Sequence, residues 1–170
     1  QMVVKGLDFE HVNLVGIIDA DGILSFTDFR VNEKAYQLME QVSGRAGRKD
    51  DQGKVLIQVS QANHPVLQFV QGHNYPALFD FEIHNRQAFN YPPFSRIILI
   101  TCKHVDKNIA QEAANILMRG LSSSYAKYIT GPAQPLVDRI RNQYLWELLC
   151  KIPKQQVSIG TFKTKLQQQI

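Results

Sequence analysis

The chain has 170 residues, of which 44% are hydrophobic and 20% are charged, and its formal net charge is +4. This composition is typical of a folded globular protein and excludes a disordered or fibrous chain, while the length allows one domain or two small ones. No apolar run reaches the length of a membrane span, the first residues lack the layout of a signal peptide, and Gln1 is not an initiator residue. We therefore expect a piece of a longer cytoplasmic protein.

The first half of the chain predicts alternating strands and helices. The near-continuous apolar run Val12–Ile18 is typical of a strand buried on both faces of a parallel sheet, and Asp19–Gly22 should end it in a turn. A helix should follow, with Thr27 and Asp28 as candidate N-caps, and end at Gly44. Its apolar stripe consists of Val31, Ala35, Leu38, Met39 and Val42. The later predicted elements of an α/β unit are a strand over 55–59 and helical segments over 66–70 and 75–89.

A domain boundary is expected at Asn90–Phe94, because two consecutive prolines stop any helix there. Beyond it the pattern predicts a strand over Ile97–Thr101, a helix capped by Asp106, and a turn at Thr130–Pro132. The apolar stripe of that helix consists of Ile109, Ala113, Ile116, Leu117 and Leu121.

An alternating strand is predicted over Arg139–Ile152, followed by a last helix from about Ser158. One face of this strand consists of Ile140, Tyr144, Trp146, Leu148, Cys150 and Ile152, and the other of Arg139, Arg141, Gln143, Glu147 and Lys151. The order strand–helix–strand–strand–helix resembles a ferredoxin-like, split βαβ domain that lacks its final strand.

The two halves of the chain differ in charge. Residues 1–91 carry 8 Lys/Arg against 11 Asp/Glu, whereas residues 92–170 carry 11 against 4. Positive charge concentrated in one segment favours a polyanionic partner, such as nucleic acid or an acidic protein surface. A basic face is also common as a merely solvated surface, and charge alone leaves both interpretations open.

Neither cysteine nor histidine shows the spacing of a metal site. Cys102 and Cys150 stand alone, so the sequence indicates neither a disulfide framework nor a zinc site. The five histidines are scattered and form no His-Glu-x-x-His motif. We expect a reducing, cytoplasmic setting and no metal ligand within this chain.

The stretch Gln41–Arg48, with the sequence QVSGRAGR, places two arginines three residues apart, each directly after a glycine. A guanidinium group offers a planar set of donors that matches phosphate oxygens, and a neighbouring glycine lets the backbone approach a ligand closely. One interpretation is therefore a pair of phosphate-sensing arginines. The alternative is a helix C-cap at Gly44 followed by a basic surface turn, and the spacing alone does not decide between them.

Several segments together resemble a known family. The segments of the first half resemble motif V, an intervening segment and motif VI of superfamily-2 helicases, in the same order and at the same spacing. The segments of the second half resemble the C-terminal domain of the replication-restart helicases, the primosomal protein N-prime family. The segments are QMVVKGLDF (1–9), TDFR (27–30), QVSGRAGR (41–48), YPPF (91–94), GPAQP (131–135) and RIRNQYLWELLCKI (139–152). The resemblance covers nearly the whole chain.

This resemblance implies an α/β fold in two parts. Residues 1–90 would form the C-terminal part of the second RecA-like helicase lobe, and residues 91–170 a ferredoxin-like α+β domain that binds DNA. It also implies that Arg45 and Arg48 reach the γ-phosphate of a nucleotide, with Arg48 as the arginine finger, and that Gln41 positions the nucleotide or the hydrolytic water. The remaining nucleotide-binding residues implied are Lys5, Gly6 and Asp8 of motif V and Gly44 and Gly47 of motif VI. Asp8 is nearly as well suited to cap a helix.

The main nucleotide-binding motifs do not occur in this sequence. It contains neither the P-loop pattern GxxxxGK[ST] nor a DExx box after a strand. ATP and Mg²⁺ are therefore expected to bind mainly to an upstream lobe, and the family's zinc only to an upstream insertion. This fragment alone should not hydrolyse ATP.

DNA contacts are predicted for basic side chains of the second half. The candidates are Arg139, Arg141, Lys151, Lys127 and Lys154, together with Lys163 and Lys165. Such residues contact the phosphate backbone and give salt-sensitive affinity without reading the sequence. Tyr144 and Trp146 could stack on bases, but their phase in the predicted strand favours the core.

The predicted function is part of an ATP-dependent 3′–5′ DNA helicase that recognises and remodels stalled replication forks and initiates primosome assembly for replication restart. The expected partners are forked and single-stranded DNA, single-stranded-DNA-binding protein and primosome components, with no membrane. Two alternatives remain at this point: a non-enzymatic nucleic-acid or protein-docking module with vestigial helicase motifs, and another superfamily-2 helicase that remodels forks.

Overall fold

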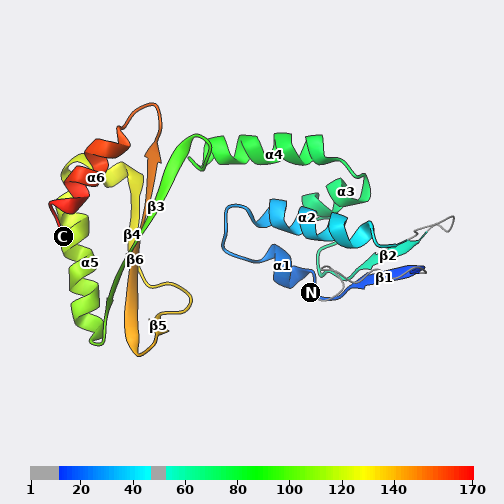
Figure 1. Ribbon diagram of the computed structural model, residues 1–170, viewed down its shortest axis with the longest axis horizontal. Helices are drawn as coiled ribbons and strands as arrows, with labels where there is room; N and C mark the ends of the chain where they lie inside the picture. The colour runs from blue at the N-terminus through cyan, green and yellow to red at the C-terminus, as the bar shows by residue number, and fades with distance from the viewer. Residues whose placement is uncertain (1–11, 47–52) are drawn as a thin grey trace. The chain divides into compact units, whose positions relative to one another are not determined.

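The computed structural model describes residues 12–46 and 53–170 (Figure 1). The chain divides into two compact units, residues 1–85 and residues 86–170, and the division falls inside one helix, α4 (Tyr75–Ala88). Both units combine helices with small sheets, so the expected mixed α/β class is confirmed. Among the described residues, no helix has both the length and the apolar character that a membrane span needs.

The first unit is built on two parallel strands, β1 (Leu14–Ile17) and β2 (Lys54–Ile57). Parallel neighbours need a crossover connection, and helix α2 (Val31–Ser43) lies in the chain between them. The short helix α1 (Asp21–Leu24) follows β1, and helix α3 (Pro65–Gln71) follows β2 and precedes α4. The predicted strand–helix–strand order of this unit is therefore confirmed.

The core of the first unit lies on one face of the two strands. It consists of Ala20, Ala35, Tyr36, Met39, Val66, Val70 and Leu78, contributed by the turn after β1 and by α2, α3 and α4. Val15 is 8% exposed, whereas Leu14 and Leu56 are 56% and 62% exposed. The prediction that residues 12–18 are buried on both faces is therefore wrong for the described residues, because their helices cover only one face of the sheet.

The second unit is built on a four-stranded antiparallel sheet, in which three strands follow the order β3–β6–β4 and the two-residue strand β5 pairs with β6. Its elements are β3 (Ser95–His104), α5 (Lys107–Tyr125), the 3₁₀ turn η1 (Ala126–Tyr128), β4 (Ile129–Ala133), β5 (Arg139–Ile140), β6 (Gln143–Pro153) and α6 (Ile159–Gln167). Since β6 runs antiparallel to both neighbours, β3 and β4 are parallel to each other with β6 inserted between them. This is the connectivity of a split βαβ unit.

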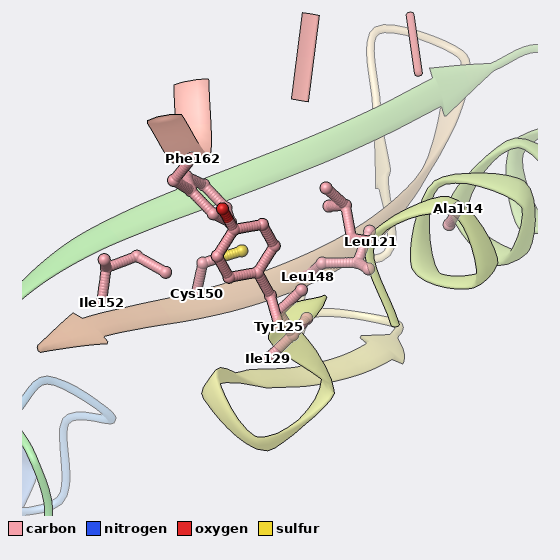
Figure 2. Close-up of a cluster of buried hydrophobic side chains, with 8 residues drawn as sticks. All are labelled: Ala114, Leu121, Tyr125, Ile129, Leu148, Cys150, Ile152 and Phe162. Carbon is pink, nitrogen blue, oxygen red and sulfur yellow. The ribbon is translucent and has the colours of Figure 1, made fainter. Parts of the chain in front are cut away.

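Helices α5 and α6 pack on one face of this sheet and form its core (Figure 2). Leu148, Cys150 and Ile152 point from β6 into this core and are completely buried. Phe162 of α6 is also completely buried, and its ring meets the ring of Tyr125 edge-on with 5.0 Å between centroids. The even-numbered residues of β6 therefore form the inward face, as the alternation predicted.

The N-cap of α5 is confirmed, but its predicted stripe is only partly right. The Asp106 carboxylate accepts hydrogen bonds from the amides of Asn108 and Ile109. The buried row consists of Ala110, Ala114, Leu117, Leu121 and Tyr125, while Ile109 and Ile116 are about half exposed. Two adjacent apolar rows are present on this helix, and periodicity alone did not distinguish the buried row from the exposed one.

The predicted strand over 139–152 is interrupted by a hairpin. Arg141 and Asn142 both have positive φ, 49° and 63°, and they connect β5 to β6 as a two-residue turn. Ile140 consequently lies on the other side of this turn and is exposed, and it does not share the inward face with Leu148. Gly131 of β4 has a φ of 113°, and a Cβ there would lie 2.6 Å from the carbonyl oxygen of Glu147, so this position requires glycine.

Candidate functional site

The end of helix α2 carries the described part of the predicted phosphate-sensing motif. The helix ends at Ser43, and the amides of Gly44, Arg45 and Ala46 still bond back to Glu40, Val42 and Ser43. The helical path thus continues through a tightened turn, which carries Arg45 just beyond the last turn of α2, where Gln41 lies.

Gly44 is not a left-handed helix cap. Its φ and ψ are −67° and −1°, and a Cβ at this position would lie 3.5 Å from the Glu40 carbonyl, an ordinary contact distance. The usual reason for a glycine after a helix is therefore absent here. The predicted site residues Arg48, Gly47, Lys5, Gly6 and Asp8 lie outside the described residues, and their roles stay predictions.

An open hollow of about 560 Å³ adjoins this end of α2. Its lining mixes polar and apolar side chains and includes Ser43, Val55, Ile57, Leu67, Gln71 and His73. Side chains from α2, β2 and α3 meet there, so the hollow is part of the same region of the first unit as Arg45.

A second region lies at the carboxyl ends of β1 and β2, where α/β sheets commonly bind ligands. The Asp21 carboxylate accepts hydrogen bonds from the amide of Ser60 at 2.8 Å and from its hydroxyl at 3.0 Å. With His64, these residues line a hollow of about 270 Å³. The sequence prediction treated Asp19–Gly22 only as a turn; the signal for this site was that polar residues follow both predicted strands.

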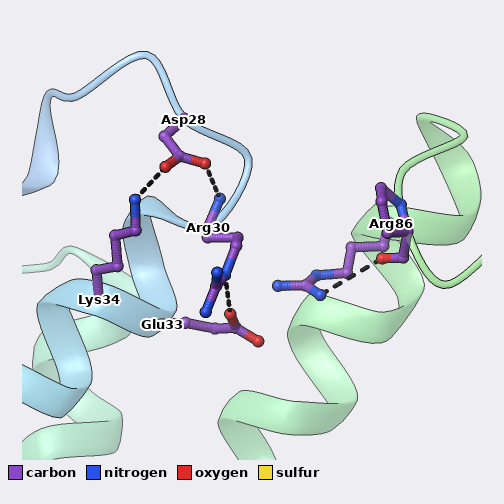
Figure 3. A network of polar contacts seen from close by, with 6 residues as sticks. Asp28, Arg30, Glu33, Lys34 and Arg86 are labelled. Carbon is purple, nitrogen blue, oxygen red and sulfur yellow. Dashed lines mark hydrogen bonds and ion pairs between the residues drawn. The ribbon is translucent and has the colours of Figure 1, made fainter. Parts of the chain in front are cut away.

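The segment before α2 is held by ion pairs (Figure 3). The Asp28 carboxylate accepts a hydrogen bond from the Arg30 amide at 3.0 Å and pairs with the ammonium of Lys34, while the guanidinium of Arg30 lies 3.2 Å from Glu33. The Lys34 ammonium and then the Arg30 amide lower the pKa of Asp28 below its ordinary value. The prediction that Thr27 or Asp28 caps the helix is wrong: the N-cap position is Arg30, which makes no side-chain capping bond.

In the second unit, two of the predicted DNA-contacting residues lie on the β5–β6 hairpin. Arg139 and Arg141 are both exposed. The guanidinium of Arg139 bonds Asn142 and lies 4.9 Å from the centre of the Tyr144 ring, whereas Arg141 stands at the tip of the turn. Tyr144 is half-buried against this arginine, while Trp146 packs against the core, as predicted.

Lys151 differs from the other predicted DNA contacts. Its ammonium donates to the carbonyl of Phe89 at 3.1 Å and lies 3.7 Å from the centre of the Tyr91 ring. It therefore ties the segment before β3 onto the sheet. Near that segment, the Arg86 side chain donates to the carbonyl of Pro92 at 3.4 Å (Figure 3).

Lys127 and Lys154 lie toward the other end of β6. Lys127 stacks on the Tyr128 ring at 4.8 Å, and the Tyr128 hydroxyl donates to Gln156 in the turn that contains Lys154. Ten residue steps of about 3.3 Å separate the two ends of β6, so roughly 33 Å separates this basic group from the hairpin arginines. The structure thus divides the predicted DNA contacts into two exposed groups and one engaged lysine.

The thiols and the described histidines form no metal-binding arrangement. Burial raises the pKa of Cys150 to about 11 and also raises that of Cys102. Among residues 12–46 and 53–170, no three histidine, cysteine or acidic side chains gather where they could hold an ion.

Comparison with known proteins shows which family the second unit belongs to and which proteins the whole chain is similar to. The family model described as the primosomal protein N C-terminal domain matches residues 87–169, and this part of the chain therefore belongs to that domain family. Along most of its length the chain is also similar to proteins named replication restart protein PriA. The protein from Synechocystis sp. is 40% identical over 158 residues, which is 90% of this chain and 19% of the relative. The one from Bacillus subtilis is 34% identical over 168 residues, 98% of this chain and 21% of the relative, and that from Treponema pallidum is 34% identical over 155 residues, 90% and 24%.

The chain spans about a fifth of the length of these relatives. Similarity runs through both units, and it fits the C-terminal part of a replication restart protein. The resemblance inferred from the motifs is therefore confirmed.

Proposed function

We propose that this chain is the C-terminal part of an ATP-dependent 3′–5′ DNA helicase that remodels stalled replication forks and begins primosome assembly. The observation that carries the proposal is the 34% identity over 98% of the chain to a protein named replication restart protein. A role in restarting replication follows from these relatives, and the helicase mechanism rests on the residues of the first unit.

The first unit supplies the nucleotide-facing part of a RecA-like lobe in this proposal. Parallel strands joined through helix α2 support such a lobe. Arg45 follows Gly44 in a turn where, among the described residues, neither dihedral angles nor crowding requires glycine, and the close approach of a ligand would account for that residue. Arg48 acts as the finger on the γ-phosphate, and Gln41 orients the nucleotide or water.

The second unit supplies a ferredoxin-like DNA-binding domain. Its connectivity and its two exposed basic groups support this role. The spacing of roughly 33 Å between the groups is close to one turn of B-form DNA, about 34–36 Å, so both could meet the phosphate backbone on one side of a duplex. Arg139, Arg141, Lys127 and Lys154 are the proposed contacts, and Lys151 holds the domain together.

The complete protein binds ATP and Mg²⁺ in its upstream lobe and zinc in an upstream segment in this proposal. It works in the cytoplasm on forked and single-stranded DNA, together with single-stranded-DNA-binding protein and primosome components. The relatives' name supports a place in the replication machinery.

The proposal is tested with the longer protein that contains this chain and its upstream lobe. DNA-stimulated ATP hydrolysis is measured for the unchanged protein, for Arg48→Ala and for Arg45→Ala. Loss of an arginine finger should lower the rate by about 10³–10⁵-fold. Arg30→Ala is the matched control, because this exposed arginine pairs locally with Glu33 and should leave the rate unchanged.

The 170-residue chain alone is assayed beside it and should show no ATP hydrolysis. If Arg45→Ala and Arg48→Ala both retain the full rate in the longer protein, the arginines have no catalytic role and a docking module is the better description. Strong ATPase activity of this chain alone that survives Arg48→Ala would also contradict the proposal, because it would show that this chain hydrolyses ATP without the upstream lobe and without Arg48.

A further inference from the structure

A loop of the second unit projects from the edge of its sheet between β4 and β5 (Figure 1). Ala133 of β4 lies opposite Glu147 of β6. Arg139 of β5 lies opposite Tyr144 of the same strand. Between these two pairs the chain takes six steps while β6 takes three, so three residues are surplus to the ladder. They cannot follow the edge of the sheet, and residues 134–137 therefore bulge away from it.

The loop is anchored where it leaves and rejoins the sheet. The amide of Leu145 donates to the carbonyl of Asp138 at 2.8 Å, which continues the pairing of β5 with β6 by one position. The side-chain amide of Gln134 donates to the Asp138 carboxylate at 3.4 Å. Pro135 has a fixed φ and restricts the backbone of the residue before it. The next residue, Leu136, is therefore presented on a constrained projection.

The tip of this loop is apolar. Leu136 is 90% exposed and Val137 is 62% exposed, and Ile140, shortly after them, is 51% exposed. Single apolar residues on a protein surface are common, but three within five residues on a projection form a patch that indicates binding. An apolar side chain that is this exposed in the free chain contributes favourable free energy when a ligand covers it.

Positive charge borders the apolar tip. Arg139 and Arg141 are exposed, and they follow Leu136 by three and five residues, which limits the Cα separations to about 11 Å and 18 Å. Asp138 is the only carboxylate between residues 129 and 146. The tip therefore suits a ligand that has an apolar interior and negatively charged borders. Stacked bases between phosphate backbones have this arrangement, whereas an apolar groove of a protein has no general reason to be bordered by negative charge.

We propose that Leu136 inserts between bases at the branch point of forked DNA, while Arg139 and Arg141 contact neighbouring phosphates. This inference rests on the DNA-binding role proposed above for the second unit, and it adds the residue that detects the branch. Insertion of an apolar side chain unstacks a base step, which costs free energy. The cost is smallest where a base is already unpaired, as at a branch. Leu136 therefore selects DNA by its structure and reads no sequence.

The test uses the 170-residue chain and a forked DNA that carries 2-aminopurine beside the branch point. This fluorescent analogue of adenine brightens when it is unstacked. A second fork carries the same base about ten base pairs away, one helical turn into an arm. Saturating protein should raise the fluorescence at the branch by about twofold or more and leave the signal in the arm unchanged.

Substitution of Leu136 separates insertion from phosphate binding. Leu136→Ser should abolish the rise in fluorescence and weaken binding to the fork by about tenfold, as expected when a leucine is no longer buried. The slope of log K against log salt should stay the same, because leucine neutralises no phosphate. Leu136→Met, which keeps an apolar side chain of similar size, should retain both the fluorescence and the affinity.

Two further variants serve as controls. Ile116→Ser removes an apolar side chain that is 51% exposed on α5, and it should bind the fork as the unchanged chain does. Arg139→Ala should give the converse of Leu136→Ser: a salt slope smaller by about 0.9, with the branch signal retained at saturation. Urea unfolding verifies that Leu136→Ser is folded, and its midpoint should be unchanged because residue 136 is exposed.

The results distinguish this inference from the proposed function. Suppose that the unchanged chain binds the fork with salt-dependent affinity but Leu136→Ser binds equally well, or retains the branch signal. Insertion by Leu136 is then wrong while the DNA-binding role stands, and an apolar groove of a partner protein is the better ligand for the tip. If the unchanged chain binds neither fork at about 50 mM salt, the DNA-binding role itself is wrong, and the inference about Leu136 with it.

Discussion

Arg141→Ala and Lys151→Met should have opposite consequences, although both residues belong to the predicted DNA-binding set. Arg141 stands exposed at the tip of the β5–β6 turn, whereas the Lys151 ammonium bonds the Phe89 carbonyl and covers the Tyr91 ring. The first substitution should weaken DNA binding and leave stability unchanged, because alanine and arginine tolerate the positive φ equally badly. The second should lower stability and leave DNA binding unchanged.

The magnitudes follow from these contacts. Each lysine or arginine that neutralises one phosphate contributes about 0.9 to the slope of log K against log salt. Arg141→Ala should therefore reduce that slope by about 0.9, so a fourfold rise in salt would cost the variant about 3.5-fold less affinity than it costs the unchanged protein. Lys151→Met removes a cation–π contact and a charge-assisted hydrogen bond near the surface, and the free energy of unfolding should fall by about 1–2 kcal/mol.

Both quantities are accessible with the purified chain. Anisotropy of a labelled forked DNA, measured at several salt concentrations, gives the slope, and urea unfolding gives the stability. Lys154→Ala removes an exposed lysine and should behave like Arg141→Ala. The reasoning would be refuted if Lys151→Met reduced the salt slope as much as Arg141→Ala did, or if it left the unfolding midpoint unchanged.

Three further predictions concern the packing and the charges. Phe162→Ala should lower the free energy of unfolding of the second unit by about 3–5 kcal/mol, because the ring is completely buried against Tyr125, and the fluorescence of the single tryptophan in that core would report the change. Cys150, whose pKa burial raises to about 11, should resist alkylation at pH 8 in the folded chain and react once the chain is unfolded, as mass spectrometry would reveal. Asp28→Asn should reduce stability at neutral pH, because the Lys34 pairing lowers the pKa of the Asp28 carboxyl in the folded chain. The stabilisation by the ionised carboxylate is lost as the pH falls below about 3.8, so the urea midpoints of the two proteins should converge there.

Local sequence patterns predicted the structure correctly where a single pattern of residue types pointed to one element. The strand around Val15, the helix over 31–43 and the Asp106 cap were all predicted, because an apolar run, an amphipathic stripe and a side-chain cap depend on neighbours a few residues away. The same reasoning predicted the inward face of β6 through Leu148 and Cys150. The motifs also predicted the family, because they combine residue type with order along the chain.

Prediction from local patterns was wrong where the same residues fitted two helix faces or two backbone conformations equally well. Ile109 and Leu117 lie on adjacent rows of α5, and only contact with the sheet selects the row that is buried. The alternation predicted Arg141 and Asn142 as part of one strand, but both residues have a left-handed backbone and form a turn. The periodicity of apolar residues gives no signal for such a turn.

The sequence by itself determined the family, the order of the longer helices and strands, and the residue types available for phosphate and DNA, but it predicted a turn at Thr130–Pro132 where strand β4 lies. The tertiary structure decided which of those residues are accessible: it engaged Lys151 with Tyr91 and placed Arg141 on a hairpin tip. It also placed the exposed Leu136 on a loop that projects from the edge of the sheet. The physical reason is that charge and hydrophobicity are properties of single residues, whereas burial and pairing depend on groups that are distant in the chain and adjacent only after folding.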